Sequence, residues 1–139
     1  MPSQFILVAG PLVRASSWEP TAECLRVAGC GVQVPDVLAR DYPPPSWRGW
    51  TSRLLEHLTT CSEPILVGHS SASALVADLA TKVPARGVII VDGDVPPSQG
   101  AAFPVRPALL DFIKGLVEAD GMLPIWSRWF DRDQQRKAL

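Results

Sequence analysis

The eight residues Ile65-Leu66-Val67-Gly68-His69-Ser70-Ser71-Ala72 decide the fold. The run opens with a short apolar stretch after Pro64, and it leads into a segment of small residues at positions 71–82. Such an apolar stretch is typical of a strand buried on both faces of a parallel sheet, and small residues let the following helix lie close to that sheet. The segment therefore predicts a strand, a very tight turn at Ser70 and a helix.

Three further segments predict strands that belong to the same sheet, at residues 5–9, 31–35 and 87–92. Helical patterns separate them, from Trp18 (capped by Ser17) to Ala28 and from Trp47 to Leu58. The alternation predicts an α/β fold: a parallel, mostly four-stranded sheet with helices on both faces. We expect the strands in the order second, first, third, fourth.

Two amphipathic segments follow the sheet, at residues 108–119 and after Pro124. No linker separates them from the rest, so we expect a single domain in which residues 1–100 form the sheet core and residues 101–139 form additional helices.

Composition excludes several classes of function. The chain has 139 residues, of which 47% are hydrophobic and 19% are charged, as in globular proteins. A net charge of −1 predicts neither nucleic-acid nor membrane-surface binding. There is no apolar run of about 20 residues and no basic N-terminal signal, which favours a cytoplasmic location. The three cysteines have no metal-ligand spacing, so we expect free thiols, no metal and no cofactor: Cys24, Cys30 and Cys61.

The turn at Ser70 has the form G-x-S-x-A, at residues 68–72. Small residues two before and two after the serine avoid clashes in a tight strand-to-helix turn. Such a turn projects the Ser70 hydroxyl into a crevice, and the N–H of Ser71, at the helix start, points at an oxyanion formed there. An ordinary tight turn without chemistry is the competing interpretation.

These segments resemble the α/β-hydrolase superfamily. Residues 5–9 resemble the strand before the oxyanion loop, and Gly10-Pro11-Leu12-Val13 resembles that loop. Residues 67–72 resemble the nucleophile elbow, in its GHS variant. The resemblance covers essentially the whole chain, but only about the first half of a typical member, so it implies a truncated α/β-hydrolase-like fold.

Other parts of the chain extend this resemblance. Ser16-Ser17-Trp18 occupies the place of a small residue and a tryptophan before the first helix. Residues 88–92, followed by Pro96-Pro97, resemble the next strand and the entry to the cap. Gly121-Met122-Leu123-Pro124, with Trp126 and Trp129, resembles the cap helices of a bacterial subgroup of small hydrolases. Residues 101–139 are therefore expected to be cap-like.

The resemblance implies roles for individual residues. Ser70 would be the nucleophile, with the N–H groups of Ser71 and Leu12 as the oxyanion hole, because Pro11 has no N–H to donate. Asp92, or Asp94 nearby, ends the fourth strand, where some members place the triad acid, although a turn or cap role is an equal alternative. The substrate-binding candidates are Pro11, His69, Trp47, Trp126 and Trp129.

A catalytic histidine is missing from the expected place. The family order is serine, acid and then histidine, yet the only two histidines, His57 and His69, precede Ser70. The side chain of His69 should point away from Ser70. Without a base, a serine hydroxyl is a poor nucleophile, so this chain by itself is expected to be a poor esterase.

Two classes of function remain open. The first is an enzyme that acts through Ser70 on a small apolar ester, thioester or lactone, completed by a second chain, with a biosynthetic pathway as one setting. The second is a non-hydrolytic member with an incomplete triad, either of cyclase or lyase type or a ligand-binding or partner subunit.

The apolar surface predicts a protein partner in addition to a small-molecule substrate. The fourth strand would have a bare apolar edge, and residues 108–130 carry more apolar surface than a four-stranded sheet needs. The helices could fold back over this edge, or a homodimer or a complementing second chain could cover it. We favour the homodimer or the second chain.

Overall fold

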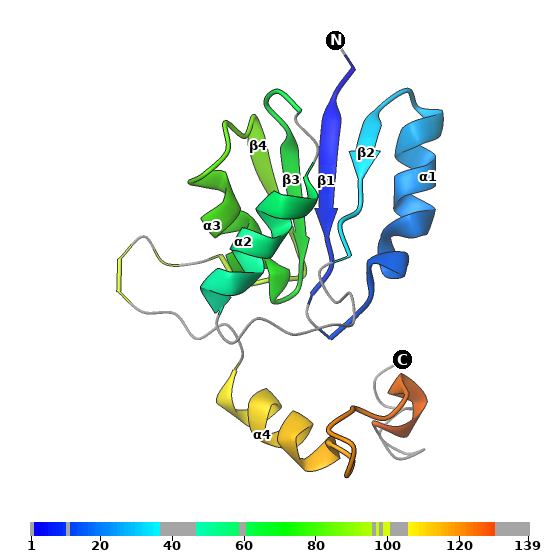
Figure 1. Cartoon of the computed structure of the whole chain (residues 1–139), viewed down its shortest axis with the longest axis vertical. Helices are drawn as coiled ribbons and strands as arrows, with labels where there is room; N and C mark the ends of the chain where they lie inside the picture. Colours follow the sequence, from blue (N-terminus) through cyan, green and yellow to red (C-terminus); the bar gives the residue numbers. More distant parts are fainter. Residues whose placement is uncertain are drawn as a thin grey trace. The chain divides into compact units, whose positions relative to one another are not determined.

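The computed structural model describes residues 2–10, 12–36, 47–58, 61–95, 97, 99–100 and 106–129, with the backbone alone at 47, 48 and 126. The chain divides into two compact units, Met1–Ala102 and Phe103–Leu139. The first unit contains a four-stranded sheet in the order β2-β1-β3-β4 (Figure 1). All three neighbouring pairs are parallel, which confirms the predicted topology. The strands are β1 (Gln4–Val8), β2 (Gly31–Gln33), β3 (Ile65–His69) and β4 (Gly87–Val91).

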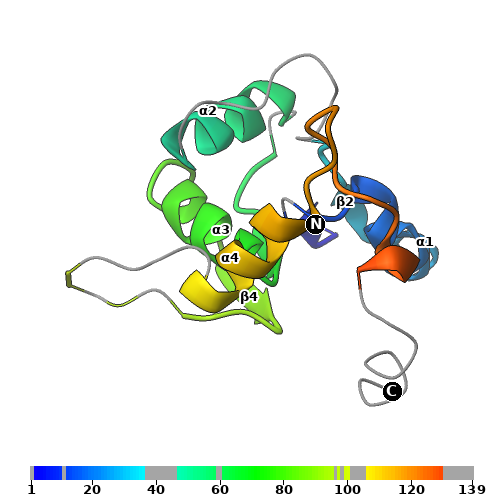
Figure 2. The ribbon, with the colours of Figure 1, turned by 90° about the horizontal axis from the view of Figure 1, so that it is seen from below.

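Helices cover both faces of this sheet. On one face lies α1 (Glu19–Val27), preceded by the short 3-10 helix η1 (Ala15–Trp18). On the other face lie α2 (Trp47–His57) and α3 (Ala72–Ala80), as the view along the sheet shows (Figure 2). The connections between successive parallel strands therefore contain helices, as parallel pairing requires.

The larger core lies between the sheet and the helices α2 and α3. Leu54 of α2, Leu66 of β3 and Leu75 of α3 are completely buried there. A smaller cluster of Leu7, Ala22 and Val67 packs beneath α1. Burial of apolar side chains is the main driving force for this packing, and it fixes α3 firmly against β3.

The start of α1 differs from the expected one. Ser17 is not a side-chain cap: it lies inside η1, and its N–H donates to the carbonyl oxygen of Arg14 at 3.0 Å. The first residue outside α1 is Trp18, which forms no side-chain cap bond, and Pro20 occupies the first turn. A tight 3-10 turn thus satisfies backbone groups that a serine cap would otherwise serve.

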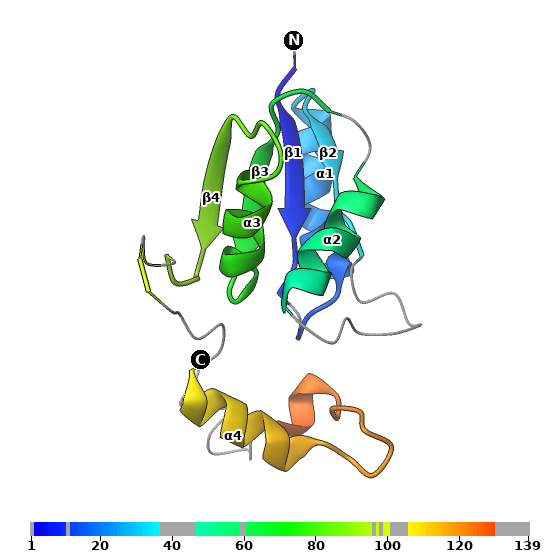
Figure 3. The same ribbon diagram turned by 60° about the vertical axis from the view of Figure 1, so that its left-hand side comes forward.

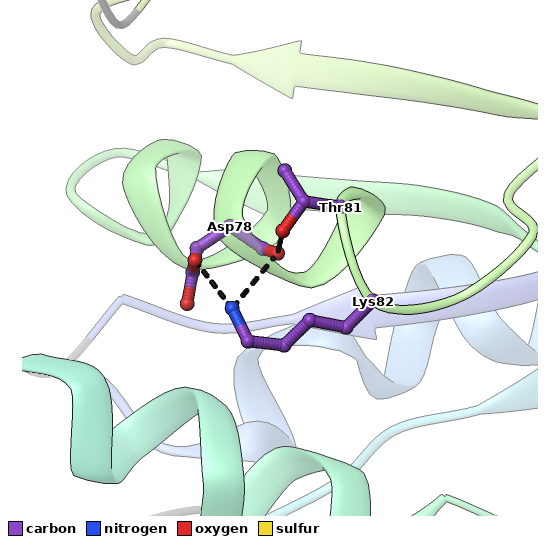
Figure 4. Close-up of polar contacts among 3 residues, drawn as sticks. All are labelled: Asp78, Thr81 and Lys82. Carbon is purple, nitrogen blue, oxygen red and sulfur yellow. Dashed lines mark hydrogen bonds and ion pairs between the residues drawn. The ribbon is translucent and has the colours of Figure 1, made fainter.

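Polar contacts close the C-terminal end of α3. Thr81 Oγ1 donates to the carbonyl oxygen of Asp78 at 2.7 Å, and Lys82 Nζ pairs with the Asp78 carboxylate (Figure 4). All three side chains are at least partly exposed, so we assign them to helix termination, away from the end of α3 that starts after Ser70.

Packing is incomplete at β4. This strand forms one edge of the sheet, next to β3 (Figure 3). Val88, Ile89 and Val91 are 41%, 45% and 39% exposed. Successive side chains of a strand point to opposite faces, so β4 is open on both faces as well as along its outer edge.

The second unit contains α4 (Pro107–Leu116) and the 3-10 helix η2 (Trp126–Arg128). No residue of α4 is buried, and Leu109 and Leu110 are among its exposed apolar side chains. Trp129 is buried within this unit, where its indole Nε1 donates to the carbonyl oxygen of Pro124 at 2.8 Å. Among the described helices of either unit, none has the length and apolar character of a membrane span.

Candidate active site

Ser70 lies in a strained turn between β3 and α3. Its φ of +55° lies in the left-handed region, and its side chain is exposed. Such a conformation costs a residue other than glycine about 1–3 kcal/mol, so the surroundings must enforce it. The N–H of Ser70 donates to the carbonyl oxygen of Val91 at 2.9 Å, and its own carbonyl oxygen accepts the N–H of Ser73 at 3.0 Å. The predicted tight turn is thus present.

Two glycines make room for this turn. A Cβ on Gly68 would lie 2.8 Å from the carbonyl oxygen of Ala72 and 2.7 Å from Val76 Cγ2, so only glycine lets α3 start so close to β3. A Cβ on Gly93 would lie 2.6 Å from the carbonyl oxygen of Ser70. The chain that follows β4 therefore lies directly against the backbone of the turn at Ser70.

The loop after β1 reaches the same turn. A Cβ on Gly10 would lie 3.4 Å from Ser71 Oγ and 3.8 Å from the Cβ of Ser70. The N–H of Val13 donates to the carbonyl oxygen of Gly10 at 3.0 Å, which closes a turn that contains Leu12. Within the described part of the chain, the N–H groups of Leu12 and Ser71 make no hydrogen bond. Their role as an oxyanion hole stays a prediction.

Asp92 follows β4 directly and adopts a φ of +49°, a second left-handed residue beside the first. Its carboxylate is exposed, and its neighbour Val91 is the residue that holds the Ser70 N–H. Because β3 and β4 are parallel neighbours, the carboxyl ends of both strands lie side by side at the same end of the sheet. Asp94 lies two residues further along and is also exposed.

The two histidines lie elsewhere. His69 is the last residue of β3, and its ring meets the Trp18 ring edge-on, with centroids 6.3 Å apart and an angle of 89° between the rings. His57 is the last residue of α2 and is exposed. The chain continues from it to the start of β3, whereas Ser70 follows the end of β3. In the described structure, neither histidine forms a hydrogen bond with Ser70.

The structure does not test the remaining substrate-binding candidates. Pro11 and the side chains of Trp47 and Trp126 lie outside the described residues. Trp129 belongs to the second unit, where its indole Nε1 donates to the carbonyl oxygen of Pro124, and its role in substrate binding stays a prediction. No group of three or more His, Cys, Asp or Glu side chains among the described positions is arranged to hold a metal ion.

Sequence reasoning missed two contributors. Gly93 touches the turn at Ser70, and the dipeptide Asp92-Gly93, a common turn signal, was the available clue. The sequence predicts only the position of Trp18 before the first helix. Nothing in the spacing of residues predicts that its ring contacts the ring of His69.

Comparisons with known proteins agree with the fold. Residues 5–138 match the model of the alpha/beta hydrolase family. An extracellular alpha/beta-hydrolase from a Paenibacillus species, described as sharing structural and functional homology with tobacco salicylic acid binding protein 2, has a similar structure. It is 24% identical, its TM-score is 0.69, and the match covers 86% of this chain and 53% of that one.

Two further solved structures are similar. Polyneuridine aldehyde esterase is 20% identical with a TM-score of 0.64, over 86% of this chain and 50% of its own. A variant of tomato methylketone synthase I, in complex with β-ketoheptanoate, is 21% identical with a TM-score of 0.58, over 69% of this chain and 42% of its own. The search of curated proteins found no match.

The chain thus spans about half the length of these solved structures. The family match extends over both units and includes the strained serine turn with its flanking loop. This chain belongs to the alpha/beta hydrolase family.

Proposed function

We propose that Ser70 is the nucleophile of an acyl-transfer reaction, the hydrolysis of a small apolar ester, thioester or lactone. The observation that carries this proposal is the exposed serine held at a φ of +55° at the start of a helix. Strain of this kind concentrates at functional sites because the rest of the structure must sustain it.

The reaction would proceed in two steps. The Ser70 oxygen forms a bond to the carbonyl carbon, and the negative charge moves to the carbonyl oxygen, which accepts the N–H groups of Ser71 and Leu12. The bond to the leaving group then breaks, and that group takes the proton which Ser70 released to a base. Water repeats the sequence on the acyl-serine and releases the acid.

The base in this proposal is an imidazole that residues 1–139 do not supply, because neither of their two histidines is hydrogen-bonded to Ser70. The ring of His69 packs on Trp18, and His57 is the last residue of α2, from which the chain continues to the start of β3. In this proposal Asp92 orients the imidazole; the support is that the preceding residue, Val91, accepts the Ser70 N–H. A complementing second chain would complete the triad.

The names of similar proteins support the substrate class. One of them is an esterase, and another was solved with β-ketoheptanoate, a short acyl compound. Leu12, 40% exposed on the loop beside Ser70, adds apolar surface of the kind that small-ligand sites use. The cytoplasmic location stays a prediction.

A second function has one observation in its favour. No histidine of the described chain is bonded to the serine, and a site without a base can still bind a carbonyl ligand through the same donors. In that case Ser70 would only donate a hydrogen bond, and the protein would be a non-hydrolytic or ligand-binding member of its family.

Labelling with a fluorophosphonate probe separates the two functions. We expect the wild-type chain to be labelled slowly, and free imidazole in the buffer to raise the labelling rate by at least about tenfold, because it supplies the missing base. Ser70→Ala should abolish labelling. Ser62→Ala, an exposed serine in the turn before β3, is the matched control and should change nothing.

Two results would overturn the covalent mechanism. One is the absence of labelling in the wild-type chain at every imidazole concentration while the fold is intact by circular dichroism. The other is labelling that persists in Ser70→Ala, which would place the reactive group elsewhere.

A further inference from the structure

Ser71 has a hydroxyl group to which the proposed mechanism gives no role. It directly precedes α3, where a serine usually caps a helix, yet its side chain forms no cap hydrogen bond. A capping serine adopts an extended backbone, whereas Ser71 has a φ of −62° and a ψ of −15°. Within the described part of the chain, the half-buried Ser71 hydroxyl has no hydrogen-bond partner.

The turn at Ser70 imposes this backbone conformation on Ser71. The carbonyl oxygen of Ser70 accepts the N–H of Ser73 at 3.0 Å, so Ser71 occupies the second position of a hydrogen-bonded turn. Its φ and ψ are close to the values of about −60° and −30° that this position has in a type I turn. The turn that holds Ser70 in the left-handed region therefore also keeps the Ser71 hydroxyl from capping α3.

The Ser71 hydroxyl lies between this turn and the loop after β1. A Cβ built on Gly10 would be 3.4 Å from Ser71 Oγ and 3.8 Å from the Cβ of Ser70. Both atoms thus border the same point of the loop. Leu12, whose N–H is one of the proposed donors to the oxyanion, follows Gly10 by two residues. The hydroxyl is therefore next to the parts from which the proposed oxyanion hole is drawn.

The loop itself has few hydrogen-bond donors to offer. Pro11 has no N–H, and the N–H of Val13 is already bonded to the carbonyl oxygen of Gly10. Of the three residues after Gly10, only Leu12 thus keeps an N–H that has no partner in the described part of the chain. A side-chain hydroxyl beside Gly10 would compensate for the donor that the proline removes.

We propose that the Ser71 hydroxyl is a third donor of the oxyanion hole, beside the N–H groups of Ser71 and Leu12. The inference rests on the proposed role of Ser70 as the nucleophile. When the Ser70 oxygen bonds to the carbonyl carbon, negative charge moves to the carbonyl oxygen, and the Ser71 hydroxyl donates a hydrogen bond to it. The hydroxyl keeps its proton throughout, and its hydrogen can rotate to follow the oxygen.

The rate of fluorophosphonate labelling, measured on the full chain with imidazole in the buffer, tests this role. We expect Ser71→Ala to be labelled about tenfold more slowly than wild type, because the phosphoryl oxygen loses a donor as its charge develops. Ser71→Thr keeps the hydroxyl and should be labelled within about threefold of the wild-type rate. Ser62→Ala, an exposed serine before β3, is the matched control and should not change the rate.

A second probe separates a donor from a structural role. In a fluorothiophosphonate, sulfur replaces the phosphoryl oxygen, and sulfur is a weak hydrogen-bond acceptor. We expect Ser71→Ala to slow labelling by this probe less than about twofold, while the oxygen probe loses about tenfold. A substitution that merely displaced the turn would slow both probes equally. Circular dichroism should show every variant folded.

The outcomes distinguish this inference from the proposed function. If the wild-type chain is not labelled at any imidazole concentration, the role of Ser70 and that of the Ser71 hydroxyl are both wrong. If the wild-type chain is labelled and Ser71→Ala reacts at the same rate, only the third donor is wrong. Equal slowing of the oxygen and sulfur probes by Ser71→Ala would also overturn the third donor alone.

Discussion

The turn after β3 and the outer side of β4 lie next to each other, yet they are packed in opposite ways. β3 has a strand on each side, and the start of α3 is so close that Gly68 cannot carry a Cβ. β4 has one neighbour, and Gly87 at its start has nothing within 4 Å of its Cβ position. The candidate nucleophile Ser70 therefore follows a strand with two neighbours, and the candidate acid Asp92 follows a strand with one neighbour in the described sheet.

This contrast has a functional meaning. The parts that position Ser70, Ser71 and Leu12 all come from within one unit of the chain. Neither described histidine, His57 or His69, is hydrogen-bonded to Ser70, so the base that would finish a triad is not found among the described residues. The proposed oxyanion hole is drawn from Ser71 and Leu12, whereas no such base is bonded to Ser70 in the described part of the chain, so we expect added imidazole to raise the labelling rate.

The largest effect should come from the core beside the turn. Leu75→Ala removes a completely buried side chain of α3 and should lower the free energy of unfolding by about 2–5 kcal/mol. Val88→Ala on β4, where the side chain is 41% exposed, should cost less than about 1 kcal/mol.

Urea denaturation measures both values. Equal losses at the two positions would contradict the contrast between a packed and an open region.

A smaller effect is expected from the glycines. Gly68→Ala forces its Cβ against the carbonyl oxygen of Ala72 and should destabilise the fold by about 1–3 kcal/mol. Gly87→Ala meets open space and should be neutral or stabilising by up to about 1 kcal/mol. Thermal unfolding followed by circular dichroism compares the two, and a larger loss at Gly87 would show that β4 is covered.

The smallest effect concerns the strain itself. Ser70→Gly removes the hydroxyl but relieves a left-handed φ, so it should stabilise the chain by up to about 1 kcal/mol while abolishing probe labelling. The control is Ser71→Gly, at an ordinary φ of −62°, which should not stabilise. Chemical denaturation measures the free energy of unfolding of the two variants. A Ser70→Gly variant that is less stable than wild type would mean that the turn is not strained.

Much of the fold could be predicted because its signals are local. Four apolar runs, the small-residue segment of α3 and the glycine two residues before Ser70 are enough to place the strands, their order and the turn. Periodicity and turn chemistry act within a few residues, so one sequence contains them.

The rest depended on contacts between distant segments. Nothing in the spacing shows that Gly93 would touch the carbonyl of Ser70, or that the ring of His69 would pack on Trp18. The expected cap at Ser17 failed for a related reason, because the 3-10 turn of η1 met the needs of the backbone first. Side-chain direction at such places is set by tertiary packing, which a local pattern does not encode.

The hydrogen bond from the Ser70 amide to Val91 has a mechanical consequence. Fraying at the end of β4 would release Ser70 from one of its two backbone anchors. The rigidity of the serine turn therefore depends on how firmly the end of the neighbouring strand is held.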